Sequence, residues 1–263
     1  MGLSIVLRET NRYMQQCLPY EHSQEISVDK MWSYGEVVAF DLETTGLDIR
    51  TALPVSYAFC TYQNRFLVSA NEQIVNPGVE IPKEAIAIHG ISNEEAVERG
   101  EDLAVAIRRM YDNILDLGKR NIPLVGMNLT YDLSIVSLLG KQFLGASLYE
   151  VGWKGPAVDI LVLDRYFVKE RMGRRNLAAL CGYYGIGNRQ PHKSFSDAQA
   201  SCEILFKMAD QFKIDDYEPA MLHHLQGQWY LDWAQNYFIS STSRHREPLT
   251  EEQRHWPIYG YAI

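Results

Sequence analysis

The strongest structural signal in the chain is a stretch that joins an apolar run to an acidic motif, VVAFDLETTGLD at residues 37–48. The run 37–40 is short, β-branched and aromatic, which predicts a buried central strand. Side chains alternate along a strand, so Asp41 and Glu43 leave its end on the same side. Two carboxylates held close together repel each other unless a cation or a shared proton relieves them. The pair is therefore either a metal site or two solvated loop residues, and the other residues of the chain must distinguish these two interpretations.

Composition indicates a globular protein. Its 263 residues suffice for one large domain, or for one domain with a sizeable appendage. A formal net charge of −8 argues against a broad basic surface, but it is compatible with an enzyme that holds only a few nucleotides. The four cysteines are scattered without a CxxC pair, which predicts reduced thiols. No apolar run is long enough to span a bilayer, so we expect a cytoplasmic protein that does not contact a membrane.

Strand and helix signals alternate after the first strand. Two strands at 55–62 and 65–69, joined by a tight turn at Gln63-Asn64, would form an antiparallel meander with it. Helices are expected before Gly90 and at 101–117, 131–144, 177–184 and 197–212, and short strands at 122–128 and from 156. This order predicts an α/β fold.

Three further residues stand where ligand sites form in such folds. Asp132 falls in the first turn of the helix at 131–144, where its simplest role is to compensate the helix dipole. Ser196 is predicted to cap the helix that follows, which places Asp197 in its first turn and His192 on the preceding loop. His89, at the end of an apolar stretch, has a simpler explanation as a buried structural histidine.

Together these residues form a chemically coherent set. Ligand crevices of α/β sheets lie at strand ends and helix starts. Four carboxylates can hold two divalent cations about 3.5–4 Å apart, the arrangement used for in-line displacement at phosphorus. Oxygen ligands favour Mg²⁺ or Mn²⁺, and a loop histidine can take the proton from the attacking water. The set predicts a phosphodiester hydrolase.

The motifs DLETTGLD, AIAIHGIS, GMNLTYDL, and NLAALCGYYGI followed by HKSFSDA resemble the DEDDh family of 3′–5′ exonucleases. The likeness covers roughly residues 36–212 and is strongest to the branch of proofreading epsilon subunits of bacterial replicases. It implies an RNase H-like fold, with a central mixed five-stranded sheet flanked by helices. Tyr131 stands where the family often has Phe, which we regard as a conservative change. Thr44 stands where oligoribonucleases usually carry Met, which favours the proofreading branch.

The resemblance also implies roles for individual residues. The metal ligands, for two Mg²⁺ or Mn²⁺ ions, would be Asp41, Glu43, Asp132 and Asp197, and His192 would be the general base. The residues around the 3′-terminal nucleotide would be Leu42, Thr44, Leu47, His89 and Asn128. Asp159 matches a supporting carboxylate near the site.

The chain divides into an N-terminal extension (1–34), an exonuclease domain (35–212) and an aromatic-rich helical segment (213–263). In the last, Leu222, Leu225, Trp229, Trp233 and Tyr237 recur at helical spacing. This helix either packs on the catalytic domain or offers aromatics to a partner. The run QWYLDW at 228–233 resembles a sliding-clamp peptide, although such peptides bind extended and this run predicts a helix.

The leading functional interpretation is a metal-dependent 3′–5′ exonuclease that acts on single-stranded or frayed DNA ends, with a DNA polymerase as partner in proofreading. An RNA-trimming exonuclease, like oligoribonuclease or RNase T, remains open because the ligand set does not read the 2′-hydroxyl. A third reading is a polymerase-associated binding subunit without nuclease activity. It is disfavoured because all five catalytic residue types are present.

Overall fold

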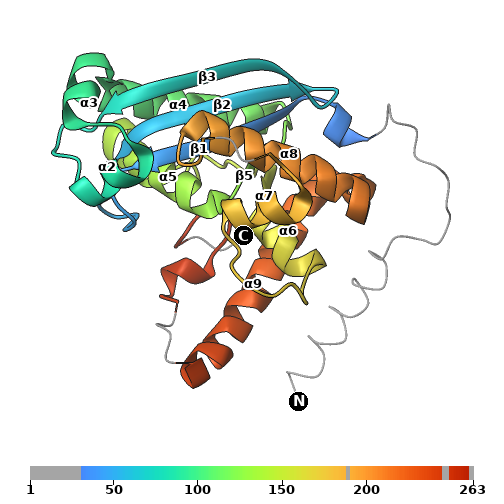
Figure 1. Cartoon of the computed structure of the whole chain (residues 1–263). Coiled ribbons are helices and arrows are strands. Elements are labelled where there is room, and N and C mark those ends of the chain that lie inside the picture. The colour runs from blue at the N-terminus through green and yellow to red at the C-terminus, as the bar shows by residue number, and fades with distance from the viewer. Residues whose placement is uncertain (1–30, 188–189, 245–248, 261–263) are drawn as a thin grey trace.

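The computed structural model describes residues 31–187, 190–244 and 249–260. A mixed sheet of six strands forms the centre, in the order β4-β3-β2-β1-β5-β6, with helices on both faces (Figure 1). The predicted helix-flanked mixed sheet is therefore confirmed. The sixth strand is β4 (Glu101–Asp102), which pairs in parallel with the end of β3. Two residues are too few to produce a sequence pattern, which is why five strands were expected.

β1 (Val37–Thr44) lies inside the sheet, between β2 and β5, and both of its faces are buried. It pairs antiparallel with β2 (Pro54–Gln63) over its whole length and parallel with the short β5 (Leu124–Gly126). β6 (Ala157–Asp159) follows β5 as the other edge.

The β2–β3 hairpin turns one residue later than expected. β3 (Phe66–Asn76) follows Asn64 and Arg65, which have φ values of 51° and 64°. Two successive positive φ values are the requirement of the type I′ turn, whose twist suits a hairpin. The predicted Gln63 belongs to β2 instead.

The helices cover the two faces of the sheet unequally. α4 (Leu103–Lys119) and α5 (Leu129–Leu144) pack against the face that carries Val38 and Phe40. α8 (Ser194–Phe212) crosses the opposite face, over Val37 and Ala39 (Figure 1). The remaining helices of the domain are α2 (Lys83–His89), α3 (Asn93–Arg99), α6 (Ile160–Phe167) and α7 (Leu177–Tyr184).

Several predicted helix ends are confirmed, and others are shifted by two or three residues. Gly90 ends α2 with φ 74°, and Asn176 caps α7 by accepting from the backbone N–H of Ala179. α8, however, begins at Ser194 rather than after Ser196. The reason is Glu72 of β3, whose Oε1 accepts from the Ser194 hydroxyl and from the Phe195 N–H, both at 3.2 Å. Glu72, far away in the sequence, thus caps the helix start in place of the expected Ser196 side chain.

The C-terminal segment packs on the domain through α9 (Pro219–Arg244). His223 Nδ1 accepts from the N–H of Ala157 at 3.1 Å, and Gln226 accepts from the N–H of Asp159 at 2.8 Å. The Gln226 amide also donates to the carbonyl of Ala157 at 3.0 Å. These bonds satisfy the open side of β6, a strand edge that otherwise exposes unpaired backbone groups.

Two tryptophans of α9 pack inward. The Trp229 ring stacks on Tyr166 of α6 with centroids 3.8 Å apart, and Arg165 lies 3.5 Å from the Trp233 ring centroid. Beyond α9, Thr250 and Gln253 form a reciprocal cap, with hydrogen bonds of 3.3 and 2.9 Å, next to a short 3-10 helix (Glu252–Arg254). The run 228–233 is helical, as its pattern predicted.

Most of the predicted extension 1–34 lies outside the described residues. Its last part, the 3-10 helix Trp32–Tyr34, contacts the segment Ile214–Asp216, because Ser33 donates from its N–H and its hydroxyl to the Asp215 carboxylate, both at 2.8 Å. Among the described residues, no helix is long and apolar enough to cross a membrane.

Candidate active site

The end of β1 extends beyond its short neighbour β5, and α5 fills the space that this leaves. β5 pairs only with Val38 and Ala39, so the next residues of β1 have no strand on that side. The Leu42 N–H there donates to Oδ1 of Asp132 at 3.2 Å, which brings the first turn of α5 against the strand. Gly126 makes the connection tight, since a Cβ there would lie 3.0 Å from the Phe40 carbonyl and 2.9 Å from Leu129.

The first turn of α8 brings a second set of groups to the same strand end. Asp41 and Glu43 follow Val37 and Ala39 on the α8 face of β1. Glu43, His192 and Asp197 each offer a ligand atom, and these atoms lie within 4.8 Å of one another. Such a group suits a divalent cation.

Electrostatics tie all four carboxylates to one site. Burial raises the pKa of Asp41 well above its ordinary value, and the charges of Asp132, Glu43 and Asp197 raise it further. Burial and the charge of Asp197 raise the pKa of Glu43 to about 8. Burial likewise raises the pKa of Asp132 and of Asp197. The four carboxyls therefore resist being charged at the same time, and a bound cation is what would allow all of them to ionise.

The loop that carries His192 is held from three directions. His192 has φ 61°, which is uncommon for a residue with a side chain, and its N–H donates to Asp197 Oδ2 at 3.1 Å. Lys193 Nζ donates to the carbonyl of His89 at 2.9 Å. Ser194 is fixed by Glu72, as described above. Lys193 was not predicted as a site residue, although it follows His192 directly, and its charge lowers the pKa of Glu43.

The residues expected around a terminal nucleotide differ in their exposure and in their contacts. Leu47 is 88% exposed, and Thr44, three residues earlier, is partly buried. Leu42 is 7% exposed and belongs to the core, so its side chain is not available to a ligand. Asn128 lies before α5 in the left-handed conformation, and its N–H donates to Asp159 rather than to a neighbour in its own helix.

His89 has an unpaired polar atom despite being 2% exposed. Its Nδ1 accepts from the Ile91 N–H at 3.1 Å, so the ring proton of the neutral form lies on Nε2. Burial and the nearby charge of Lys193 lower the pKa of His89, which favours this neutral form. Nε2 has no partner among the described residues. Buried donors without a partner are rare in proteins, so this one indicates a functional role.

Asp159 supports the site from behind. One of its oxygens accepts from the N–H groups of Asn128, at 3.0 Å, and Leu161, at 2.9 Å. It thereby joins the start of α5, which carries Asp132, to the start of α6. Its charge also raises the pKa of Asp132.

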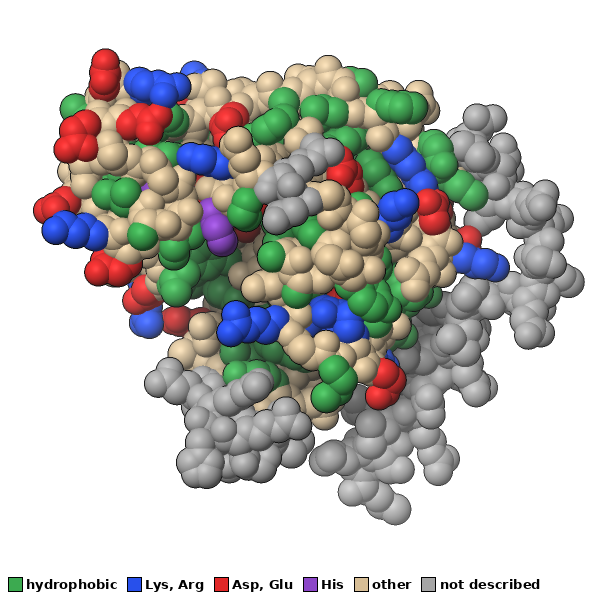
Figure 2. Space-filling model, viewed as in Figure 1, with side chains coloured by type: hydrophobic (Ala, Val, Ile, Leu, Met, Phe, Trp, Pro, Cys, Tyr) green, Lys and Arg blue, Asp and Glu red, His purple; other side chains and the backbone are tan. Residues whose placement is uncertain are grey.

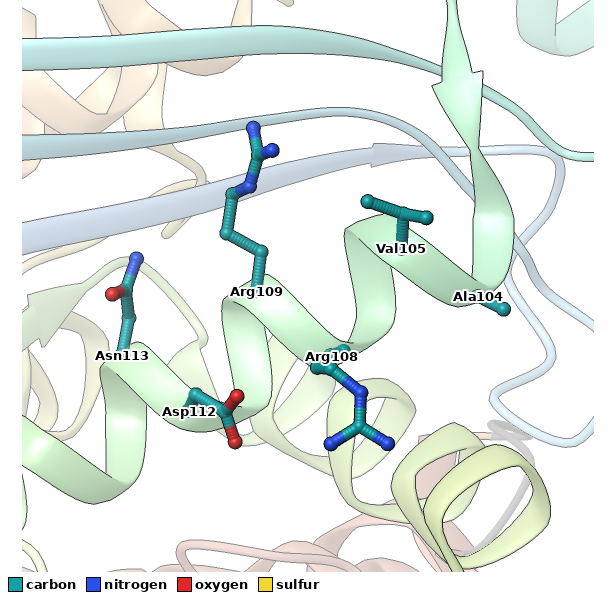
Figure 3. A pocket seen from close by; sticks show the side chains of 6 residues that line it. All are labelled: Ala104, Val105, Arg108, Arg109, Asp112 and Asn113. Atoms are coloured by element: carbon teal, nitrogen blue, oxygen red, sulfur yellow. The ribbon is translucent and has the colours of Figure 1, made fainter.

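A hollow elsewhere on the surface lacks this chemistry. It lies along one helix, α4, and is lined by Ala104, Val105, Arg108, Arg109, Asp112 and Asn113 (Figure 3). Arg109 extends toward the strands and pairs with Glu101 at 3.2 Å, whereas Arg108 and Asp112 point the other way (Figure 3). A single carboxylate on this face does not make a metal site, so the strand-end cluster is the candidate.

A helix-flanked mixed sheet with clustered carboxylates at the end of its central strand defines the class of RNase H-like nucleases. Comparison with known families agrees, because the model of the exonuclease family RNase_T matches residues 38–205. The chain belongs to this exonuclease family.

Individual relatives are distant. The PolC-type DNA polymerase III of Pediococcus pentosaceus is 23% identical over 73% of this chain and 13% of its own length. The DNA polymerase III epsilon subunit of Aquifex aeolicus is 24% identical over 70% of this chain and 87% of its own length. The chain thus spans about an eighth of the PolC-type relatives that it matches.

Solved structures show the same fold. Escherichia coli exonuclease I in complex with a dA16 oligonucleotide has a TM-score of 0.60 at 18% identity, over 70% of this chain and 42% of that one. Exonuclease I from Methylocaldum szegediense has a TM-score of 0.56 at 22% identity, over 69% of this chain and 42% of that one.

Proposed function

We propose that the protein removes nucleotides one at a time from the 3′ end of single-stranded or frayed DNA, with two Mg²⁺ or Mn²⁺ ions. One observation carries this proposal. Glu43, His192 and Asp197 converge within 4.8 Å, beside two further carboxyls, Asp41 and Asp132, whose pKa values are raised by burial and by neighbouring carboxylates.

The residues divide the work by their chemistry. Asp41, Glu43, Asp132 and Asp197 hold the cations, because oxygen ligands suit these ions. A bound divalent ion polarises the scissile phosphate and lowers the pKa of a bound water. His192, on its anchored loop beside Glu43 and Asp197, accepts the proton of the attacking water.

Groups around the cluster hold the terminal nucleotide. The Nε2–H of His89 is a buried donor without a described partner, and we assign it to an oxygen of the substrate. Leu47, 88% exposed after β1, offers an apolar surface to the last base. Asn128, which is anchored through its N–H, and the Thr44 side chain complete the set of groups around the nucleotide. Leu42 contributes only its backbone.

DNA is the favoured substrate because the named relatives are DNA polymerase III proteins. The same relatives make a DNA polymerase the favoured partner, in proofreading. Neither argument reads the 2′-hydroxyl, so an RNA substrate is the competing outcome of the test.

The test is a degradation assay with 5′-labelled single-stranded DNA, duplex DNA with a 3′ mismatch, and RNA of the same sequence, each with and without Mg²⁺. We expect Mg²⁺-dependent shortening of both DNAs. Preferential shortening of RNA would replace proofreading with RNA trimming. No cutting of any substrate by folded, Mg²⁺-saturated protein would overturn the proposed function.

A further inference from the structure

The segment between α6 and α7 is basic in an otherwise acidic chain. Residues 169–175, here called the basic segment, read KERMGRR, with four basic residues and one acidic, whereas the whole chain has a formal charge of −8. The proposed chemistry of the site uses none of these side chains.

Two of the four basic residues have a structural task. Asp164 of α6 is fully buried, and its carboxylate accepts from Arg171 at 2.8 Å, from Arg175, and from the Tyr184 hydroxyl at 3.2 Å. Arg175 also donates to the carbonyls of Val168, at 2.8 Å, and Arg171, at 3.1 Å. These bonds hold the basic segment in one conformation around a buried charge.

The other two basic residues, Lys169 and Arg174, are exposed, and Lys169 Nζ lies 4.9 Å from the centroid of the Tyr166 ring. Neither has a carboxylate partner among the described residues. Met172 between them is 91% exposed, and the half-exposed Tyr183 ring lies 5.4 Å from the Arg171 guanidinium. Exposed cations on a segment whose Arg171 also lies over a half-exposed aromatic ring are a combination that suits single-stranded nucleic acid.

The basic segment lies within reach of a strand held in the candidate site. Asp159 caps the start of α6 and accepts from Asn128, the residue before α5. The eight residues of α6 extend about 12 Å from there, at 1.5 Å per residue. α7 then leads back toward the His192 loop. Figure 2 shows Lys and Arg side chains below a hollow in this face and a histidine above it, and Figure 1 places the α6–α7 connection on the same side.

We propose that the basic segment binds the phosphodiester backbone of the substrate strand a few nucleotides upstream of its 3′ end. Lys169 and Arg174 contact phosphates, and Tyr183 offers a stacking surface to a base. The inference rests on the proposed function, because that function puts the 3′ end among the carboxylates. It adds that affinity grows with strand length beyond the terminal nucleotides.

The test uses the double variant Lys169→Ala/Arg174→Ala in the full chain. Binding of 5′-fluorescein-labelled dT12 and dT2 is measured by anisotropy with Ca²⁺ in place of Mg²⁺, over a series of salt concentrations, and cleavage of both is measured with Mg²⁺. We expect dT12 binding to weaken about threefold or more at low salt. The slope of log affinity against log salt should fall by about 1.4, or 0.7 per lost phosphate contact. Binding and cleavage of dT2 should stay unchanged.

A matched control removes the same charge elsewhere. Arg108 and Lys119 are exposed on α4, which packs on the face of the sheet opposite to Asp41 and Glu43. Arg108→Ala/Lys119→Ala should leave the salt slope for dT12 at its wild-type value. An equal effect of both double variants would reduce the basic segment to a contributor of overall charge and overturn the inference.

The outcomes separate the two proposals. Wild-type affinity and salt slope for dT12 in the Lys169→Ala/Arg174→Ala variant would overturn the inference and leave the proposed function intact. Absence of cleavage by the wild-type protein, with dT12 binding still lost in the variant, would overturn the proposed function and leave a nucleic-acid-binding surface.

Discussion

The hydroxyl of Tyr131 donates to the carbonyl oxygen of Gly46 at 2.5 Å and so ties helix α5 to the turn after β1. The same hydroxyl lies 2.9 Å from the Thr44 hydroxyl, which also donates to Gly46 at 2.8 Å. Burial raises the pKa of Tyr131 to about 12, so the hydroxyl keeps its proton at neutral pH. The turn that presents Leu47 is therefore fixed to the helix that carries Asp132, and the change from Phe is not merely conservative.

Tyr131→Phe removes one hydroxyl and should loosen this turn. We expect KM for a DNA 3′ end to rise about three- to tenfold, a loss of up to 1.4 kcal/mol, with kcat changed much less. The measurement is steady-state cleavage of a short single strand. Tyr111→Phe is the control, because the Tyr111 hydroxyl bonds to the Ala146 carbonyl at 2.9 Å, between α4 and α5. If both variants lower only the melting temperature, the Tyr131 hydroxyl does not position substrate.

Stability of the metal-free protein should fall as pH rises. The pKa values of Asp41, Glu43 and Asp197 are raised in the folded state, that of Glu43 to about 8. Between about pH 4 and 8 the folded protein then binds more protons than the unfolded chain, so its stability decreases with pH. Melting temperature in chelator should be higher at pH 5.5 than at pH 8, and saturating Mg²⁺ should restore it at pH 8.

Glu43→Gln tests the source of this dependence. The variant should melt higher than wild type in chelator at pH 8 and show a shallower pH dependence, because it removes one uncompensated charge. Glu98→Gln, on the exposed side of α3, should leave the dependence unchanged. A wild-type melting temperature that is flat over this range would contradict the electrostatic account.

His192→Ala should lower kcat by about 10²–10⁴-fold, the usual contribution of a general base. Affinity for Mn²⁺, measured by calorimetry, should change little. Because the imidazole lies within ligand distance of Glu43 and Asp197, the alternative is that it binds the metal. A large loss of Mn²⁺ affinity would support that alternative, and His224→Ala, exposed on α9, serves as the control.

The C-terminal segment should be needed for stability. Gln226→Ala leaves the N–H of Asp159 and the carbonyl of Ala157 without partners, which costs about 1–3 kcal/mol for a buried group. Gln228→Ala, at an exposed position two residues further along α9, should cost little. A chain ending at residue 212 should aggregate or melt far lower. Full stability and full activity of that truncated chain would instead support a role for the segment in binding a partner.

Local rules explain what the sequence predicted of the site. Strand alternation places Asp41 and Glu43 together, and short-range patterns place Asp132 and Asp197 in the first turns of their helices. Their catalytic roles stay predictions. The two-residue β4 and the start of α8 could not be predicted in this way, since β4 is defined only by its partner and α8 by Glu72, which lies more than a hundred residues earlier.

Long-range contacts explain what the sequence did not predict. Lys193 is recognisable only once its Nζ is seen at the His89 carbonyl, and Gln226 only once it is seen at the backbone of β6. Arg171 and Arg175 belong to a basic stretch of the sequence, and only the structure shows that they neutralise Asp164.

The most direct test follows a 5′-labelled single-stranded DNA over time with wild-type protein, Asp41→Asn and Asp197→Asn. The account predicts a ladder of products that shorten from the 3′ end only with Mg²⁺ or Mn²⁺. Both variants should be folded, inactive, and at least as stable as wild type in chelator. Release of the label as a mononucleotide, a fixed internal cut, or activity retained in chelator or in purified Asp41→Asn would contradict the account.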